Sequence, residues 1–280
     1  MHSTGTYPSS VDAHYARRDL LAAILDALVA AGLDPEHLKP HDLAPIDEFH
    51  VRGLKATVEL AKEIGVERDM RVLDLGSGLG GAARYLAKQY GCRVVGLDLS
   101  FDYCRAAAAL TERLGLQGEV SFRQGNALDT PFPDGSFDVV WTQHASMNIA
   151  DKAKLYGEIR RVLRPGGRLA IYDVVAGAGG DLRFPVPWAR DPASSFLLSA
   201  PKLSETLVET GFEILVWRDV TESGRSWFRC LQEKTAKEGP APFGLQLLLG
   251  PDFRQMALNQ LQNLEQDRIG LIEAVAMLPV

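Results

Sequence analysis

The sequence predicts an α/β protein with a doubly wound, mostly parallel sheet of seven strands and helices on both faces. Three observations support this fold class. Short apolar stretches typical of buried strands alternate with stretches of helical periodicity from Arg71 onward. Turn sequences such as Asp134-Gly135 and Pro165-Gly166-Gly167 separate these stretches. The composition, with 46% hydrophobic and 24% charged residues in a chain of 280, is that of an ordinary globular protein.

Each element can be assigned from its local pattern. Ligands of such sheets bind beyond the carboxyl ends of the strands, so the loops that follow the strands are expected to form the site. Strands are predicted at Arg71–Leu75, Arg93–Asp98, Glu119–Gln124, Phe137–Thr142, Arg168–Val174, Phe212–Val216 and Gly270–Met277. Helices are predicted between or around them at Leu79–Gln89, Phe101–Leu114, Asp151–Leu163, Lys202–Thr210, Arg225–Lys237 and Asp252–Leu264.

Two regions depart from this alternation and are expected to enclose a ligand. Residues 1–66 are interpreted as a helical N-terminal cap, with helices at Val11–Gly32 and from about Val51 to Ile64, joined by a Pro- and His-containing loop. Residues 67–280 form the main domain. Its insertion at about 176–200, rich in glycine, proline and aromatic residues, is expected to act as a lid over the sheet edge.

Charge, cysteine content and hydropathy argue against several classes of function. The net charge of −6 lacks the basic character of nucleic-acid-binding proteins, so no nucleic-acid partner is expected. Cys92, Cys104 and Cys230 are odd in number and scattered, which argues against disulfides or a zinc site and favours a cytoplasmic location. The apolar run Leu20–Leu33 is short and contains Asp26, so no stable membrane insertion is expected.

A glycine-rich loop, Gly76 to Gly81, joins the first strand to its helix. It satisfies both G-x-G-x-G and the dinucleotide pattern G-x-G-x-x-G. Asp98, which ends the second strand, could accept hydrogen bonds from a ribose diol in either case. The glycines alone therefore leave an NAD(P)-dependent oxidoreductase open as an alternative.

Asp74 helps to separate these possibilities because it lies two residues before the loop. A carboxylate there would repel a pyrophosphate group. It suits a ligand with cationic groups, such as the sulfonium and ammonium of S-adenosylmethionine (SAM). The alternative is that Asp74 only hydrogen-bonds the loop backbone, and the two roles are compatible.

Four ordered segments carry a family resemblance: VLDLGSGLGG, VVGLDLS, GNALDTPFPDGSFDVVWTQ and IRRVLRPGGRLAIYD, within Arg71–Val174. In this region the chain resembles the class I (Rossmann-like) SAM-dependent methyltransferases. The flanks Ile46–Gly53 and Phe184–Phe212 are similar to small-molecule methyltransferases of the ubiquinone/menaquinone and sarcosine/dimethylglycine type. The resemblance implies that the last strand runs antiparallel to the others.

The resemblance also implies roles for individual residues. Asp74 and the loop backbone would hold the methionine part of SAM, and Gln143 would face its methionyl end. Asp98 would hold the ribose hydroxyls. Asn126 stands where many relatives carry Asp, and its amide can both accept from and donate to adenine, although a simple turn role is the alternative. The expected cofactor contacts are Asp74, Leu75, Gly76, Ser77, Gly78, Gly80, Asp98, Leu99, Asn126, Ala127 and Gln143.

The segment Thr142–Asn148 lacks the Asn-Pro-Pro-Tyr-like motif of base-modifying enzymes, which argues against methylation of nucleic-acid bases. His144, just beyond the fourth strand, is the candidate general base, since a neutral imidazole can take a proton near pH 7. The alternative is that it only shapes the pocket. His50, Tyr15 and Trp188 are candidate acceptor contacts, or else packing residues.

The sequence thus predicts SAM-dependent methyl transfer to a small-molecule acceptor, with N- or O-methylation expected first and S-adenosylhomocysteine as the product. In-line displacement depends mainly on alignment and desolvation, and no metal ion is expected to take part. The alternatives are a non-catalytic SAM-binding regulator and the NAD(P)-dependent oxidoreductase. A homodimer is possible.

Overall fold

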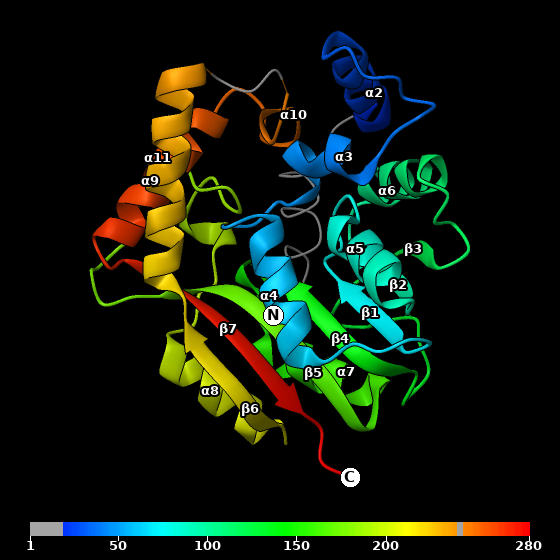
Figure 1. Ribbon diagram of the computed structural model, residues 1–280. Helices are drawn as coiled ribbons and strands as arrows, with labels where there is room; N and C mark the ends of the chain where they lie inside the picture. The colour runs from blue at the N-terminus through cyan, green and yellow to red at the C-terminus, as the bar shows by residue number, and fades with distance from the viewer. Residues whose placement is uncertain (1–18, 240–242) are drawn as a thin grey trace, which may run out of the picture.

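The central feature of the protein, seen in a computed structural model that describes residues 19–239 and 243–280, is one sheet of seven strands (Figure 1). Its order is β3-β2-β1-β4-β5-β7-β6. Only β7 runs antiparallel to its neighbours, so the predicted fold class is confirmed. The strands are β1 (Arg71–Leu75), β2 (Arg93–Asp98), β3 (Val120–Gln124), β4 (Phe137–Gln143), β5 (Leu163–Ala176), β6 (Glu213–Asp219) and β7 (Ile269–Met277).

Helices cover both faces of the sheet. Successive strand residues point to opposite faces, so Val72 packs with α4 and α5, whereas Leu73 packs with α7 and α8. The helices are α2 (Leu20–Ala30), α3 (Pro40–Asp47), α4 (Leu54–Ile64), α5 (Gly81–Tyr90), α6 (Phe101–Arg113), α7 (Lys152–Val162), α8 (Ala200–Glu209), α9 (Thr221–Glu238), α10 (Gln246–Leu249) and α11 (Phe253–Glu265). In the described part of the chain, no helix is long and apolar enough to cross a membrane.

Helix α3 lies where the sequence analysis expected a loop, and that expectation was wrong. Its two prolines are typical of loops, but Pro40 occupies the first turn, where a missing N–H costs nothing. The Asp42 carboxylate accepts a hydrogen bond from the backbone N–H of Lys39 at 2.7 Å, which caps the helix start. The helix buries Leu43 and Ile46, so it contributes to the core despite its poor sequence propensity.

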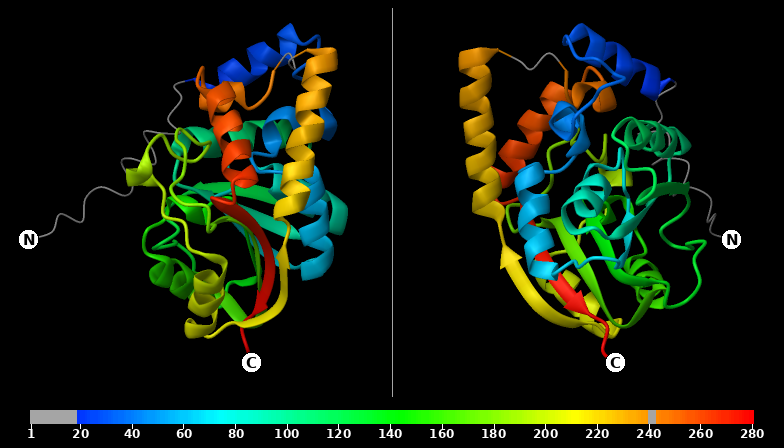
Figure 2. Two further views of the ribbon diagram at one scale, coloured as in Figure 1. Left: turned by 90° about the vertical axis from the view of Figure 1, so that its left-hand side faces the viewer. Right: turned by 45° about the vertical axis from the view of Figure 1, so that its right-hand side comes forward.

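The cover above the carboxyl ends of the strands is built from both ends of the chain. Figures 1 and 2 show α2, α3 and α10 together above the sheet, with α9 and α11 rising beside them. One apolar cluster joins Leu20 and Leu43 of the N-terminal helices to Phe243 and Leu248 near the C-terminus. The predicted cap, residues 1–66, therefore accounts for only part of this cover, because residues near the C-terminus complete it.

The irregular segment Ala176–Ser199 is held in place by asparagine side chains from other elements. The Asn148 amide donates to the carbonyl oxygens of Trp188, at 2.6 Å, and Ser194, at 3.0 Å. Asn259 and Asn263 of α11 donate to two further carbonyls of the segment, at 2.9 and 3.0 Å. Each bond satisfies a backbone carbonyl that no regular strand or helix would pair.

In the glycine loop between β1 and α5, Gly78 and Gly80 are required for different physical reasons. Gly80 has a φ of 82°, and a Cβ built there would lie 2.3 Å from Cζ of Phe122. Gly78 has a φ of 52°, and a Cβ there would meet nothing within 4 Å. Both positions are left-handed, but only Gly80 also lacks room for a side chain.

We expect Gly80→Ala to destabilise the unliganded protein by about 2–4 kcal/mol, because left-handed strain and overlap with Phe122 add. Gly78→Ala is the matched control and should cost only about 1 kcal/mol, the strain alone. Urea unfolding of both variants measures the difference. Equal losses would show that Phe122 moves aside freely and that Gly80 is required only for its backbone angle.

Candidate functional site

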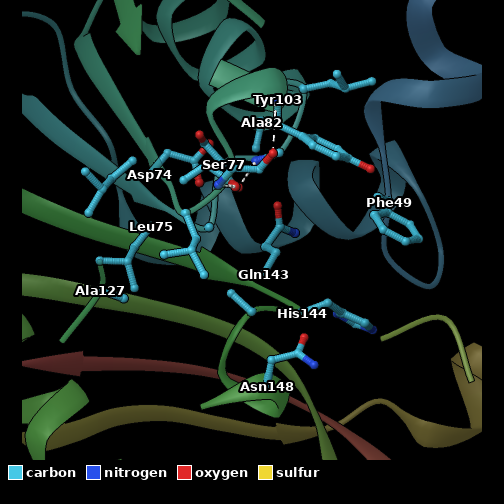
Figure 3. Close-up of a pocket in the computed structure, with 18 of the residues that line it drawn as sticks. Phe49, Asp74, Leu75, Ser77, Ala82, Tyr103, Ala127, Gln143, His144 and Asn148 are labelled. Carbon is cyan, nitrogen blue, oxygen red and sulfur yellow. Dashed lines mark hydrogen bonds between the residues drawn. The ribbon is translucent and has the colours of Figure 1, made fainter. Parts of the chain in front are cut away.

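A large cavity lies at the carboxyl ends of β1, β2 and β4, where the fold class places ligands (Figure 3). It encloses about 1170 Å³ of space, including its open mouth. The covering segments contribute Ile46, Phe49 and Leu248 to its wall. Of the expected cofactor contacts, ten line it: Asp74, Leu75, Gly76, Ser77, Gly78, Asp98, Leu99, Asn126, Ala127 and Gln143. The eleventh, Gly80, does not line it and packs against Phe122 instead.

The cavity wall is acidic. Asp47, Asp74 and Asp98 line it, and no lysine or arginine does so among the described residues. Asp74 is buried, and its Oδ2 atom has no hydrogen-bond partner within the described chain. Burial raises the pKa of Asp74 to about 7, and the nearby Asp98 and Glu48 carboxylates add to the rise. A cationic ligand would relieve this repulsion, whereas a phosphate would increase it.

Asp98 ties the end of β2 to the glycine loop. Its Oδ2 accepts a hydrogen bond from the Gly78 N–H at 2.8 Å, and its Oδ1 accepts one from Ser100 at 2.9 Å. A carboxylate oxygen has a second lone pair, so both oxygens retain capacity to accept hydrogen bonds from a ligand. The same side chain therefore shapes the loop and presents an acceptor to the cavity.

Gln143 presents a hydrogen-bond donor to the cavity. Its Oε1 accepts from the indole N–H of Trp141 at 3.0 Å. The Thr57 hydroxyl oxygen lies 3.2 Å from the same Oε1, but it donates its one hydrogen to Glu48 Oε2 at 2.9 Å. Because an indole N–H can only donate, the oxygen must face Trp141. The Nε2 group is consequently left buried and without a partner among the described residues. Figure 3 shows Gln143 at the end of β4, between the glycine loop and His144.

Asn126 has the turn role that the sequence analysis left open as an alternative. Its Oδ1 accepts a hydrogen bond from the Leu128 N–H at 2.9 Å, two residues on. This bond fixes the direction of the side chain while the residue still lines the cavity. The amide nitrogen remains available to donate to a ring nitrogen of a ligand.

His144 is half-buried and adopts a left-handed φ of 49°. Its backbone N–H donates to the Tyr172 carbonyl at 2.7 Å, and its Nδ1 lies 3.3 Å from the same oxygen. That oxygen can only accept, so Nδ1 carries the hydrogen and Nε2 is an acceptor, which is buried without a partner among the described residues. Burial, reinforced by the neighbouring His50, lowers the pKa of His144 to about 3.

The sequence analysis proposed His144 as a general base because a free imidazole titrates near pH 7. The environment of His144 in the structure conflicts with that proposal. A histidine with a pKa of about 3 stays neutral throughout the physiological range. In the unliganded protein, His144 is therefore a fixed hydrogen-bond acceptor.

His50 forms a buried pair with Glu48, a residue that the sequence analysis did not single out. Its Nε2 lies 2.8 Å from Glu48 Oε2, and its Nδ1 lies 3.3 Å from the Val51 carbonyl oxygen. Burial alone would raise the pKa of Glu48, but hydrogen bonds from His50 and Thr57, with the charge on His50, lower it overall. Both ring nitrogens of His50 thus face protein acceptors, and the ring edge faces His144 and Tyr172.

A second cavity of about 670 Å³ adjoins the first and shares Phe49, His50 and His144 with it. Trp188, a predicted acceptor contact, lines this second cavity and not the first. Tyr15, also predicted to contact the acceptor, lies outside the described residues. Within the described chain, no group of three or more His, Cys, Asp or Glu side chains is arranged to hold a metal ion.

We expect the affinity for S-adenosylhomocysteine, whose ammonium group is cationic, to depend on the ionisation of Asp74. Below the Asp74 pKa of about 7 the carboxyl is protonated, so affinity should fall about tenfold per pH unit. Above that pKa it should be level. Titration calorimetry of the wild-type protein between about pH 5.5 and 8.5 measures this dependence.

The variant Asp74→Asn supplies the control. It should bind more weakly at high pH and lose the pH dependence. A raised carboxyl pKa also destabilises the fold as pH rises from about 4 to 7, so the unliganded variant should be more stable than the wild type above pH 7 and equal to it near pH 4. A pH dependence that persists in the variant would place the titrating group elsewhere.

Comparison with known proteins places this geometry in context. The family described as "Methyltransferase domain" matches residues 73–171. The chain is 32% identical over 188 residues to O-methyltransferase resE of Aspergillus sclerotiorum, covering 64% of this chain and 70% of that protein. It is 34% identical over 132 residues to the glycine/sarcosine/dimethylglycine N-methyltransferase of Actinopolyspora halophila, covering 47% of this chain and 23% of that protein.

Other curated relatives include a probable tocopherol O-methyltransferase of Oryza sativa, 43% identical over 100 residues, covering 36% of this chain and 28% of that protein. The chain thus spans only about a quarter of this relative and of the Actinopolyspora protein. Among solved structures, phosphoethanolamine N-methyltransferase 2 of Haemonchus contortus in complex with SAM aligns with a TM-score of 0.75 at 21% identity, covering 99% of this chain and 61% of that chain. The [4+2]-cyclase SpnF aligns with a TM-score of 0.69 at 25% identity, covering 92% and 94%.

Proposed function

Because the chain belongs to the class I SAM-dependent methyltransferases, we propose that it transfers a methyl group from SAM to a small-molecule acceptor, by N- or O-methylation. The observation that carries this proposal is the junction of two unlike cavities. The acidic cavity has the charge to hold a cationic cofactor, and it meets an apolar cavity at His50 and His144. A small molecule is favoured over nucleic acid because no described lysine or arginine lines either cavity.

Three polar side chains of the first cavity would fit the cofactor group by group, and two of them, Asp74 and Gln143, have a buried atom without a partner among the described residues. The Asp74 carboxyl would face the ammonium, and the Gln143 amide nitrogen would donate to the carboxylate of the methionyl end. The Asp98 carboxylate would accept from the ribose hydroxyls. When bound, the cofactor supplies a methyl group made electrophilic by its sulfonium.

The protein's own part in the reaction is mainly alignment and exclusion of water. His144 Nε2, at the junction of the cavities, would accept a hydrogen bond from the hydroxyl or N–H of the acceptor and so aim its lone pair at the methyl group. The proton that the acceptor loses on methylation would pass by way of His144 Nε2 to water, and S-adenosylhomocysteine would be the leaving group. Because the His144 pKa is about 3, the imidazole holds such a proton only briefly, and its contribution is orientation.

The activity can be tested by incubating the protein with SAM and a panel of metabolites, with S-adenosylhomocysteine release as the readout. Asp98→Ala should weaken S-adenosylhomocysteine binding by about 1–3 kcal/mol, because a charged acceptor to two hydroxyls is lost. Binding without turnover of any acceptor would favour a SAM-binding regulator. Product formation without S-adenosylhomocysteine release would favour another reaction on this fold, and binding of NAD(H) in place of SAM would favour an oxidoreductase.

For His144→Ala we expect the acceptor kcat/KM to fall about tenfold, as for one lost hydrogen bond. Cofactor affinity should stay within about twofold, and the pH–rate profile should keep its shape between pH 5 and 8, since His144 does not titrate there. Steady-state kinetics across this range measures both quantities. A loss of about 10²–10⁴ in kcat, with disappearance of a limb near pH 6–7, would make His144 a general base in the loaded enzyme.

A further inference from the structure

The wall of the second cavity is almost wholly apolar. Eleven of its fourteen lining residues are aliphatic or aromatic or proline, and the other three are His50, His144 and Gln260. No aspartate, glutamate, lysine or arginine lines it in the part of the chain that the structure describes. The first cavity, by contrast, has three aspartates in its wall. The two compartments therefore suit ligands of different character.

Aromatic side chains shape the space. Trp227 and Phe228 of α9 meet edge to face at 4.9 Å between ring centroids. Phe253 of α11 lines the same cavity. Trp188 is 2% exposed, and its indole N–H donates to Ser195 Oγ at 3.0 Å, so its polar atom is already satisfied and it offers the cavity an apolar surface. A ligand gains binding free energy from such walls only by burying its own apolar surface against them.

The polar groups at the junction limit what a ligand can present. His50 directs both ring nitrogens at protein acceptors, namely Glu48 and the Val51 carbonyl. His144 Nε2 is buried, unpartnered within the described chain and able only to accept. A ligand must therefore bring a donor, such as a hydroxyl or an uncharged N–H, to this point.

A charged acceptor would be poorly accommodated. A phosphate or carboxylate in the second cavity would find no lysine or arginine, and the His50 ring in its wall is already paired with Glu48. An ammonium would find no carboxylate in the wall. Burying an unpaired charge in such surroundings is far more costly than burying a neutral hydroxyl that keeps one hydrogen bond.

We propose that the methyl acceptor is an uncharged, largely apolar molecule whose body fills the second cavity and whose hydroxyl or neutral N–H donates to His144 Nε2. This inference rests on the proposed function for the role of the first cavity. The second cavity itself can be tested by binding alone.

The first experiment compares ligands of one skeleton with S-adenosylhomocysteine present at saturation. The probe is N-phenyl-1-naphthylamine, a neutral dye that fluoresces in apolar sites. The competitors at neutral pH are 4-phenylphenol, biphenyl-4-carboxylate, 4-phenylphenyl phosphate and protonated 4-phenylbenzylamine. We expect 4-phenylphenol to displace the dye at a concentration at least about tenfold lower than any charged analogue. Equal or better displacement by a charged analogue, or failure of the dye and 4-phenylphenol to bind, overturns the proposal.

The second experiment uses two leucines of similar exposure. Leu231 lines the second cavity and is 43% exposed, whereas Leu215 lies on β6, away from both cavities, and is 48% exposed. Both tolerate a lysine at the surface, so folding is preserved. Leu231→Lys should weaken 4-phenylphenol binding about tenfold and tighten binding of the carboxylate, while Leu215→Lys changes neither. Unchanged 4-phenylphenol affinity in Leu231→Lys overturns the proposal.

Calorimetry with S-adenosylhomocysteine separates this inference from the proposed function. If the wild-type protein does not bind S-adenosylhomocysteine, the proposed function fails whatever the dye shows. If S-adenosylhomocysteine binds in an Asp98-dependent manner but the neutral ligands are not preferred, only the present inference fails. Leu231→Lys should keep the wild-type affinity for S-adenosylhomocysteine, because Leu231 does not line the first cavity.

Discussion

The Asp74 carboxyl group, buried at the end of β1, is the constraint on which the site depends. Desolvation and two neighbouring carboxylates hold its pKa near 7, and no lysine or arginine of the described chain lines the cavity. Arg84, the nearest buried guanidinium, is engaged by Asp47. A site with this charge is unfavourable when empty and favours a cation, so the burial of Asp74, together with direct contacts, would favour SAM over a dinucleotide.

The parts of the fold that follow from local sequence were predicted closely. Strands β1 and β2 have the predicted limits, because each is a short apolar run with a glycine near one end, Gly76 after β1 and Gly91 before β2. The four sequence motifs within Arg71–Val174 also predicted the family and its cofactor, and the comparisons confirm both. Helices α3 and α10 were missed, since one contains two prolines and the other is a single turn. Leu43 of α3 and Leu248 of α10 are buried in one apolar cluster although they lie far apart in the chain, and no local pattern reveals this.

The chemistry of the site was less predictable than its location. A histidine after the fourth strand is visible in the sequence, but its enclosure beside Tyr172 and His50 is not, and that enclosure sets its pKa. Glu48 lies two residues before His50 and has no signal of its own, because the bond between them depends on how α3 and α4 are placed. The second cavity was not anticipated since Trp227 and Phe253 come from helices far along the chain. The type of each residue can be read from the sequence, but its burial and its hydrogen-bond partners depend on the fold.

The cover that joins both ends of the chain has a consequence for how the protein matures during synthesis. Leu20 and Leu43 emerge from the ribosome early, but the apolar surface they share is completed by Phe243 and Leu248. Strand β7, which pairs with both β5 and β6, also comes last. A nascent chain would therefore expose this surface until Phe243 and Leu248 had been translated, and Leu248 would join the wall of the cofactor cavity only then. A chain that stopped before β7 would thus leave β5 with an open edge and β6 without the strand with which it pairs.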